Sequence, residues 1–188
     1  SLHDALPISL ANAAVYGSST EKTDMLILKG LFTTITNVNF NNVTIKQLTE
    51  EIHIERTRNN SQKFDDYAMK KLWNDHEDIR SLKSLILFGI KGMAAYAYHA
   101  QALGKTDSEV TSFFYKALRA IGSENDPEKL LGLVLETGNA NLKCMALLDA
   151  ANTDAYGDPV PTVAPLTIEK VPFIVVSGHD LHDMKLLL

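Results

Sequence analysis

The stretch from Leu82 to Leu103, LKSLILFGIKGMAAYAYHAQAL, decides the fold class of this chain. Its apolar residues recur at the three- and four-residue spacing of a helix face, and Gly104 follows as a candidate C-terminal cap. Alanine and glycine are frequent within it, which allows neighbouring helices to approach closely. We therefore interpret this stretch as the central core helix of a helical bundle.

The sequence around this helix has the same character. Apolar periodicity, interrupted by Gly- and Asn-rich turns, predicts further helices over residues 10–16, 22–36, 43–58, 107–121 and 128–151. Residues 152–170 contain three prolines, which indicate an extended linker. The predicted fold class is mainly α, with a helical bundle domain over residues 9–167.

Strand character begins only near residue 168. Residues 171–176, Val-Pro-Phe-Ile-Val-Val, form a short apolar and β-branched run that is followed by a Ser-Gly turn, His179 and a helical pattern. We expect residues 168–188 to be the incomplete first βα unit of a Rossmann-like α/β domain. A buried strand there would place His179 at its carboxyl end, where open α/β sheets bind ligands and metals.

Both ends of the chain have unusual sequence features. Residues 1–8, SLHDALPI, resemble the translation of a sequencing adapter and are excluded from the fold prediction. The amphipathic segment after Leu181 reaches the last residue without a cap or a helix breaker. We therefore expect the chain to be an internal fragment of a longer protein.

Composition excludes several classes of partner. The chain has 188 residues, of which 45% are hydrophobic, and 18 Lys+Arg against 23 Asp+Glu give a net charge of −5. This balance argues against a nucleic-acid or anionic-membrane surface. No apolar run approaches the roughly 20 residues that a membrane span needs. We expect a cytoplasmic protein that binds neither nucleic acid nor membrane.

Several residues with reactive side chains have an ordinary structural interpretation. Cys144 is the single cysteine, which excludes an internal disulfide, and its apolar neighbours predict a buried thiol. A lone cysteine cannot hold an iron–sulfur cluster. Asp180 is a candidate helix cap, with His182 and Asp183 on the solvated face of that helix. His179 differs from these residues because it follows a flexible turn at the end of the predicted strand.

Four segments resemble the hybrid cluster protein family, also called hydroxylamine reductase or prismane protein. They occur in the order and at about the spacing of that family, and they are GLFTTITNVNF (30–40), LILFGIKGMAAYAYHAQALG (85–104), LETGNANLKCMALLDAANTDAYGDPVPT (135–162) and VVSGHDL (175–181). The resemblance implies a cytoplasmic iron–sulfur oxidoreductase whose N-terminal helical domain precedes two α/β domains. Such proteins carry a cubane-type cluster and a hybrid iron–sulfur–oxygen cluster. They reduce hydroxylamine to ammonia, and reduction of nitric oxide is their proposed physiological role.

The resemblance also implies roles for individual residues. The histidine of the Ser-Gly-His-Asp motif is a hybrid-cluster iron ligand in the family, which predicts that role for His179. The Thr-Asn-Val-Asn motif predicts Thr36 and Asn37 as substrate-pocket residues. The family's cluster cysteines and glutamates have no counterparts in this chain, so no catalytic residue and no further cofactor ligand is assigned. We expect the chain alone to bind neither cluster. The full-length parent would act on a small nitrogen-oxide substrate and receive electrons from an unidentified donor protein.

Two alternatives remain open at this point. Nickel-dependent carbon monoxide dehydrogenases are similar in fold and also place a histidine after a strand. Their histidine is typically followed by Asn-Pro, whereas Asp180 and Leu181 follow His179 here, which favours the hydroxylamine reductase interpretation. The second alternative is a non-enzymatic helical interaction module in which His179 is an incidental turn residue.

Overall fold

A computed structural model describes residues 4–15, 17–35, 39–60, 67–168, 170–175 and 181–187. The helices among these residues are α1 (Ala5–Ala13), α2 (Glu21–Thr33), α3 (Asn42–Asn59), α4 (Met69–Trp73), α5 (Glu77–Ala102), α6 (Ser108–Ser123), α7 (Pro127–Tyr156) and α8 (Leu181–Leu187). The prediction of a mainly α fold is confirmed.

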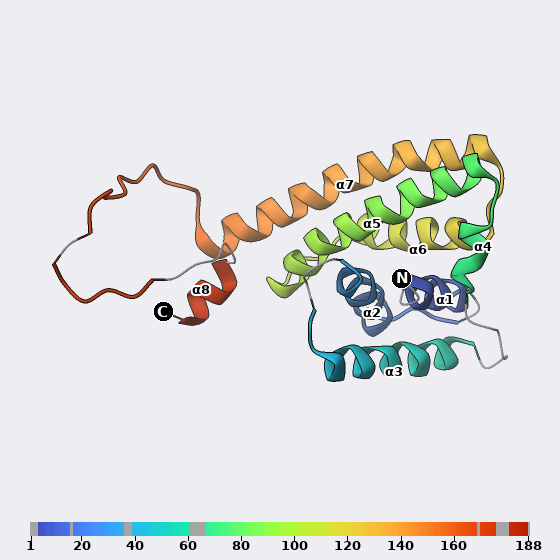
Figure 1. Ribbon diagram of the computed structural model, residues 1–188, viewed down its shortest axis with the longest axis horizontal. Coiled ribbons are helices and arrows are strands. Elements are labelled where there is room, and N and C mark those ends of the chain that lie inside the picture. The colour runs from blue at the N-terminus through green and yellow to red at the C-terminus, as the bar shows by residue number, and fades with distance from the viewer. Residues whose placement is uncertain are drawn as a thin grey trace.

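The helices form two packed groups (Figure 1). In the first group α5 and α7 run side by side in the same direction, and α6 runs antiparallel to both. In the second group α1, α2 and α3 contact one another, with α2 packed on α5 and α1 packed on α6. The core lies where the groups meet, and its fully buried side chains include Leu26, Leu31, Ile86, Ile90, Phe114 and Leu118.

Local sequence signals define where the long helices begin and end. The side chains of Asp107 and Asp126 accept hydrogen bonds from the first free backbone N–H groups of α6 and α7, at 2.8–3.4 Å. Each carboxylate also lies at the positive end of a helix dipole. Gly104 follows α5 with a φ of +79°, a left-handed conformation that favours glycine over other residues. The predicted C-terminal stop of the central helix is therefore confirmed.

The boundaries of the helices differ modestly from the predicted ones. The central helix begins at Glu77 rather than at Leu82, and the short helix α4 was not predicted. Helix α1 includes residues 5–8, and Ile8 is fully buried in the core. The adapter origin of residues 1–8 and the domain boundary near residue 168 stay predictions.

The predicted βα unit after residue 168 is wrong for the described residues. Only α8 of that unit forms, and the described residues of the chain contain no strand. Residues 172–175 have no regular secondary structure, and Ile174 is 90% exposed rather than buried. A strand satisfies its backbone hydrogen bonds only by pairing with another strand. None of the described segments offers such a partner, so β-branched composition alone does not make a strand here.

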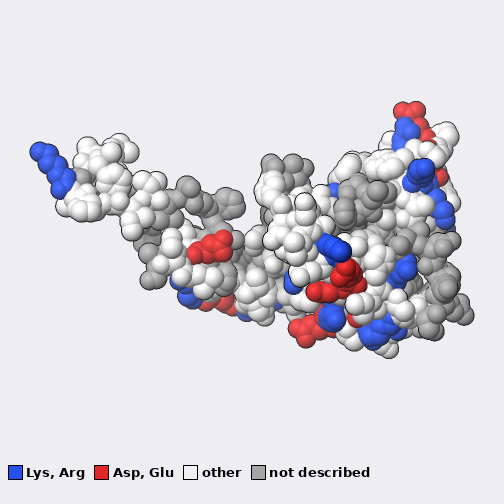
Figure 2. Space-filling model, turned by 60° about the horizontal axis from the view of Figure 1, so that its bottom comes forward, with Lys and Arg blue, Asp and Glu red and all other residues white. Residues whose placement is uncertain are grey.

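Charge is mixed over the surface. On the face drawn in Figure 2, Lys and Arg side chains alternate with Asp and Glu, and neither sign covers an extended area. Among the described helices, none combines the length and the apolar character that crossing a membrane requires.

Candidate functional site

The residues with predicted functional roles lie outside the described part of the chain. This holds for His179, the predicted iron ligand, and for Thr36 and Asn37, the predicted pocket residues. Their roles stay predictions. The described residues that flank Thr36 and Asn37 in the sequence lead from the end of α2 and into the start of α3.

The motif lies in the connection between α2 and α3, and both flanks are anchored by side-chain hydrogen bonds. On the α2 side, the Thr34 hydroxyl donates to the Leu31 carbonyl oxygen at 2.6 Å. On the α3 side, Asn39 Oδ1 accepts from the Asn41 backbone N–H at 2.9 Å. Asn41 in turn caps α3 by accepting from the Val43 N–H at 2.9 Å. The last asparagine of the motif therefore helps to start a helix.

A cavity of about 290 Å³ opens beside this connection, between α2, α3 and α5. Its wall contains Phe32 and Tyr98, whose rings stack with centroids 4.9 Å apart, and His99 meets Phe32 edge-on at 5.6 Å. The lining is Lys29, Phe32, Thr33, Asn39, Thr44, Gln47, Leu48, Glu51 and Tyr98. This mixture of hydrogen-bonding groups and aromatic rings suits a small polar molecule. Two of the lining residues, Thr33 and Asn39, lie within three positions of Thr36 and Asn37 in the sequence.

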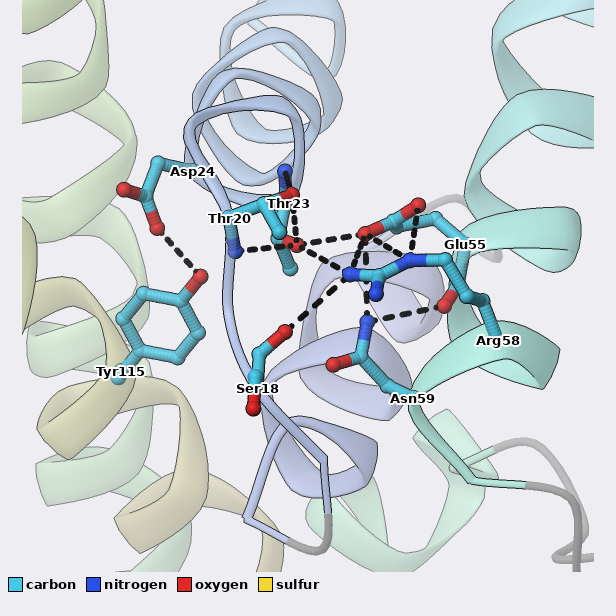
Figure 3. Close-up of polar contacts among 8 residues, drawn as sticks. All are labelled: Ser18, Thr20, Thr23, Asp24, Glu55, Arg58, Asn59 and Tyr115. Atoms are coloured by element: carbon cyan, nitrogen blue, oxygen red, sulfur yellow. Dashed lines mark hydrogen bonds and ion pairs between the residues drawn. The ribbon is translucent and has the colours of Figure 1, made fainter.

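A buried carboxylate, Glu55, lies where α2 and α3 meet (Figure 3). The Glu55 side chain is 2% exposed. It accepts hydrogen bonds from Arg58 Nη2 and from the Thr23 hydroxyl, each at 2.6 Å. Arg58 Nη2 also donates to the Ser18 carbonyl oxygen at 3.2 Å. The Asn59 side-chain amide donates to the Glu55 carbonyl oxygen at 3.0 Å. We call Ser18, Thr23, Glu55, Arg58 and Asn59 the α2–α3 polar cluster.

The polar cluster keeps Glu55 ionised. The hydrogen bond from Arg58 is the largest cause, and it lowers the pKa of Glu55 to about 2 against an opposing effect of burial. The Thr23 hydroxyl and the Arg58 charge act in the same direction. A buried carboxylate whose oxygens are satisfied in this way ties helices together. The cluster therefore has a structural role, which is to hold α2 and α3 together.

The sequence reasoning did not find the polar cluster. The spacing of Glu55 and Arg58 by three residues was visible in the sequence and is typical of a helical ion pair. Glu55 also accepts a hydrogen bond from Thr23, which lies 32 residues earlier in the chain. Nothing local to either residue reveals that contact.

Cys144 has no features of a reactive thiol. Its side chain is fully buried, and Sγ donates to the Met93 carbonyl oxygen at 3.5 Å. Burial raises the pKa of Cys144 to about 11, with a smaller contribution from Asp107. The prediction of a buried structural cysteine is confirmed.

The described residues do not by themselves fit an iron–sulfur cluster. Within them, no group of three or more His, Cys, Asp or Glu side chains is arranged to hold a metal ion. The one cysteine is protonated and enclosed by the α5–α7 contact. A cluster needs several ligands, which Cys144 alone does not supply.

Comparison with known proteins places the chain in a family. Residues 1–188 match the Prismane/CO dehydrogenase family, and the chain belongs to that family. The resemblance inferred from the four sequence segments is therefore confirmed.

Three curated relatives that resemble the chain are named hydroxylamine reductase. The hydroxylamine reductase of Thermodesulfovibrio yellowstonii is 36% identical over 222 residues, which cover 100% of this chain and 41% of the relative. The hydroxylamine reductase of Chlorobaculum tepidum is 37% identical, and the alignment covers 100% of this chain and 39% of the relative. The hydroxylamine reductase of Acetivibrio thermocellus is 40% identical, and the alignment covers 88% of this chain and 34% of the relative. The chain thus spans about two fifths of the length of these relatives.

Proposed function

We propose that this chain forms the helical part of an iron–sulfur oxidoreductase that reduces hydroxylamine to ammonia. The observation that carries the proposal is the match over residues 1–188 to relatives named hydroxylamine reductase. The proposal also includes a cytoplasmic location, a small nitrogen-oxide substrate, which could be nitric oxide, and a separate protein as electron donor.

The cofactors of the proposed enzyme are a cubane-type cluster and a hybrid iron–sulfur–oxygen cluster. When bound, such clusters supply the electrons that cleavage of an N–O bond requires. The described residues of this chain offer no multi-ligand set for either cluster. Its contribution is the imidazole of His179, with the remaining ligands supplied from outside these 188 residues.

A chimera tests the proposal directly. In it, this chain replaces the matching two fifths of the Thermodesulfovibrio yellowstonii hydroxylamine reductase, and the relative supplies the rest. We expect the chimera to bind iron stoichiometrically and to oxidise a reduced viologen dye only when hydroxylamine is present. The 188-residue chain alone should do neither.

The role of His179 is tested in the same chimera by His179→Ala. We expect this variant to lose the activity and to change the electron paramagnetic resonance signal of the hybrid cluster, because a lost imidazole alters the iron coordination. His182→Ala is the matched control and should retain both. A chimera that folds and binds iron but ignores hydroxylamine would contradict the proposal. Full activity in His179→Ala would remove the residue from the site.

The family description also includes carbon monoxide dehydrogenase, which is the second candidate. The name of the curated relatives and the Asp180-Leu181 pair after His179 favour hydroxylamine reduction. Carbon monoxide and the oxidised dye replace hydroxylamine and the reduced dye in a second assay of the chimera, which separates the two candidates. Dye reduction by carbon monoxide, together with nickel in the purified protein, would support the second candidate.

A further inference from the structure

Helices α5 and α7 carry large apolar side chains that face solvent. Leu85 and Phe88 of α5 and Leu131, Leu135, Leu142 and Met145 of α7 are between 45% and 68% exposed. Scattered exposed leucines are ordinary on protein surfaces, but a contiguous group of this size is not. These residues therefore indicate an interaction surface only if they form one continuous face.

Helical geometry places them on one face. α5 and α7 run parallel, with Gly89 opposite Thr137 and the Met93 carbonyl oxygen in contact with Cys144. At 100° per residue, Leu85 and Phe88 project on the side of this contact line that lies away from α6. Leu131, Leu135 and Leu142 project on the same side from α7. We call these six residues the α5–α7 apolar face, and they are Leu85, Phe88, Leu131, Leu135, Leu142 and Met145.

The opposite flank of α7 has a different chemical character. There Glu136 pairs with Lys116 at 2.6 Å, and Lys143 pairs with Glu109, so that ion pairs link α7 to α6. The positions of the face itself, which are Leu85, Phe88, Gly92 and Tyr96 of α5 and Leu131, Leu135, Gly138, Leu142 and Met145 of α7, hold no Lys, Arg, Asp or Glu. Lys91 borders the face, with its Nζ 5.9 Å from the centroid of the Phe88 ring. Depletion of charge is typical of the buried centre of an interface.

Two glycines provide an independent observation. A Cβ added at Gly89 would lie 2.8 Å from Thr137, so Gly89 is required for the packing of α5 on α7. A Cβ added at Gly92 or Gly138 would meet nothing within 4 Å, although glycine weakens a helix interior. Gly92 falls at the centre of the α5 stripe and Gly138 at the centre of the α7 stripe, about one helical turn apart along the axis. Both are positioned for close approach of a further backbone.

We propose that the α5–α7 apolar face docks against the part of a full-length family member that this chain does not span. The face measures roughly 20 Å by 20 Å from the helix rise and diameter, so docking would bury about 800 Å² over both partners. A stable dimer needs about 1,600 Å², whereas interfaces between domains of one polypeptide extend down to about 600 Å². The curated relatives are about two and a half times as long as the matched region, which leaves ample chain to cover the face. The inference rests on family membership and not on the proposed activity.

Thiol labelling tests the proposal. Leu142→Cys places a thiol on the apolar face, and Asn139→Cys places one on the flank toward α6, while the native Cys144 is buried. We expect maleimide to label Leu142→Cys at least tenfold more slowly in the chimera than in the 188-residue chain. Asn139→Cys should react equally in both. The remainder of the relative, added as a separate polypeptide to the 188-residue chain, should give the same selective protection without a fusion.

Alanine at the glycines tests the close approach. In the 188-residue chain, Gly138→Ala should raise Tm by about 2–4 °C, because the Cβ has free space and alanine favours the helix. In the chimera, the same change should accelerate labelling of Leu142→Cys, because the Cβ holds the docked segment away. Gly132→Ala, also in α7 with free space but on the other flank, should raise Tm without affecting that labelling.

Two results would overturn the proposal. Equal labelling of Leu142→Cys in the chain, in the mixture and in the chimera would show that the face stays exposed. Protection that grows with the concentration of the 188-residue chain alone, with dimers in sedimentation, would assign the face to a second copy. Neither result depends on hydroxylamine turnover, so the proposed function is judged separately.

Discussion

The helical body, residues 4–156, and the segment from 157 to 187 have similar apolar runs in their sequences but different structures. Both contain runs of apolar residues. In the body most of these residues are buried, the α5–α7 apolar face being the main exception, and the backbone is hydrogen-bonded within each helix. In the segment, Val163, Leu166 and Ile174 are at least 90% exposed. A helix closes its hydrogen bonds locally, whereas a strand depends on a neighbour from elsewhere in the chain, so only the first kind of prediction succeeded.

The largest difference between the two regions should be in their rates of limited proteolysis. Lys170 is exposed in the extended segment, whereas Lys83 is buried and donates to Asp75 at 2.8 Å and to Asn125 at 2.9 Å. We expect trypsin to cut after Lys170 at least a hundredfold faster than after Lys83, because cleavage of a helix requires local unfolding. Mass spectrometry of early fragments measures this. Early products cut at Lys83 would contradict the described difference.

Removing one apolar side chain from each region should give the next largest effect. Phe114 is 1% exposed in the core, and Phe114→Ala should lower the free energy of unfolding by about 3–5 kcal/mol in urea titrations. Ile174→Ala in the segment should change it by less than about 0.5 kcal/mol. A large loss from Ile174→Ala would mean that the segment packs in solution.

The α2–α3 polar cluster should make the helical body sensitive to acid. The pKa of Glu55 is about 2 in the folded state and 4.5 ordinarily, because Arg58 and Thr23 stabilise the carboxylate. Its contribution, about 3 kcal/mol at most, is fully present above pH 4.5 and is lost as pH falls toward 2. Glu55→Gln should therefore destabilise the chain at pH 7 and flatten its dependence on pH between 4.5 and 2. Urea titrations across that range measure both effects.

An exposed acid on the same helix is the control for this effect. Glu50→Gln should leave the stability and its dependence on pH unchanged, because Glu50 lies at the surface of α3. Identical acid sensitivity in Glu55→Gln and in the unsubstituted chain would show that the cluster does not hold the carboxylate.

The smallest effect concerns the start of α7. Asp126 accepts hydrogen bonds from the Glu128 and Lys129 backbone N–H groups at 3.0 and 3.4 Å. Asp126→Ala should cost about 1 kcal/mol of stability. Asp149→Ala, at an exposed position within α7, should change it by less than about 0.5 kcal/mol. Equal losses in the two variants would argue against a capping role.

The sequence predicted the family of the chain, whereas its site residues stay untested. The Ser-Gly-His-Asp and Thr-Asn-Val-Asn motifs pointed to the family, which the match over the whole chain confirmed. The placement of His179, Thr36 and Asn37 stays a prediction. The cavity between α2, α3 and α5 could not be predicted, because Lys29, Thr44 and Tyr98 come from three separate helices.

The sequence by itself determined the helices, the left-handed stop at Gly104 and the buried character of Cys144. These features depend on side-chain periodicity and on contacts within one or two turns. Tertiary structure alone decided that Glu55 is ionised in a buried cluster, that residues 171–175 do not form a strand, and that Gly92 and Gly138 share an exposed apolar face. Each of these depends on which distant segment lies alongside, a property that no local pattern encodes.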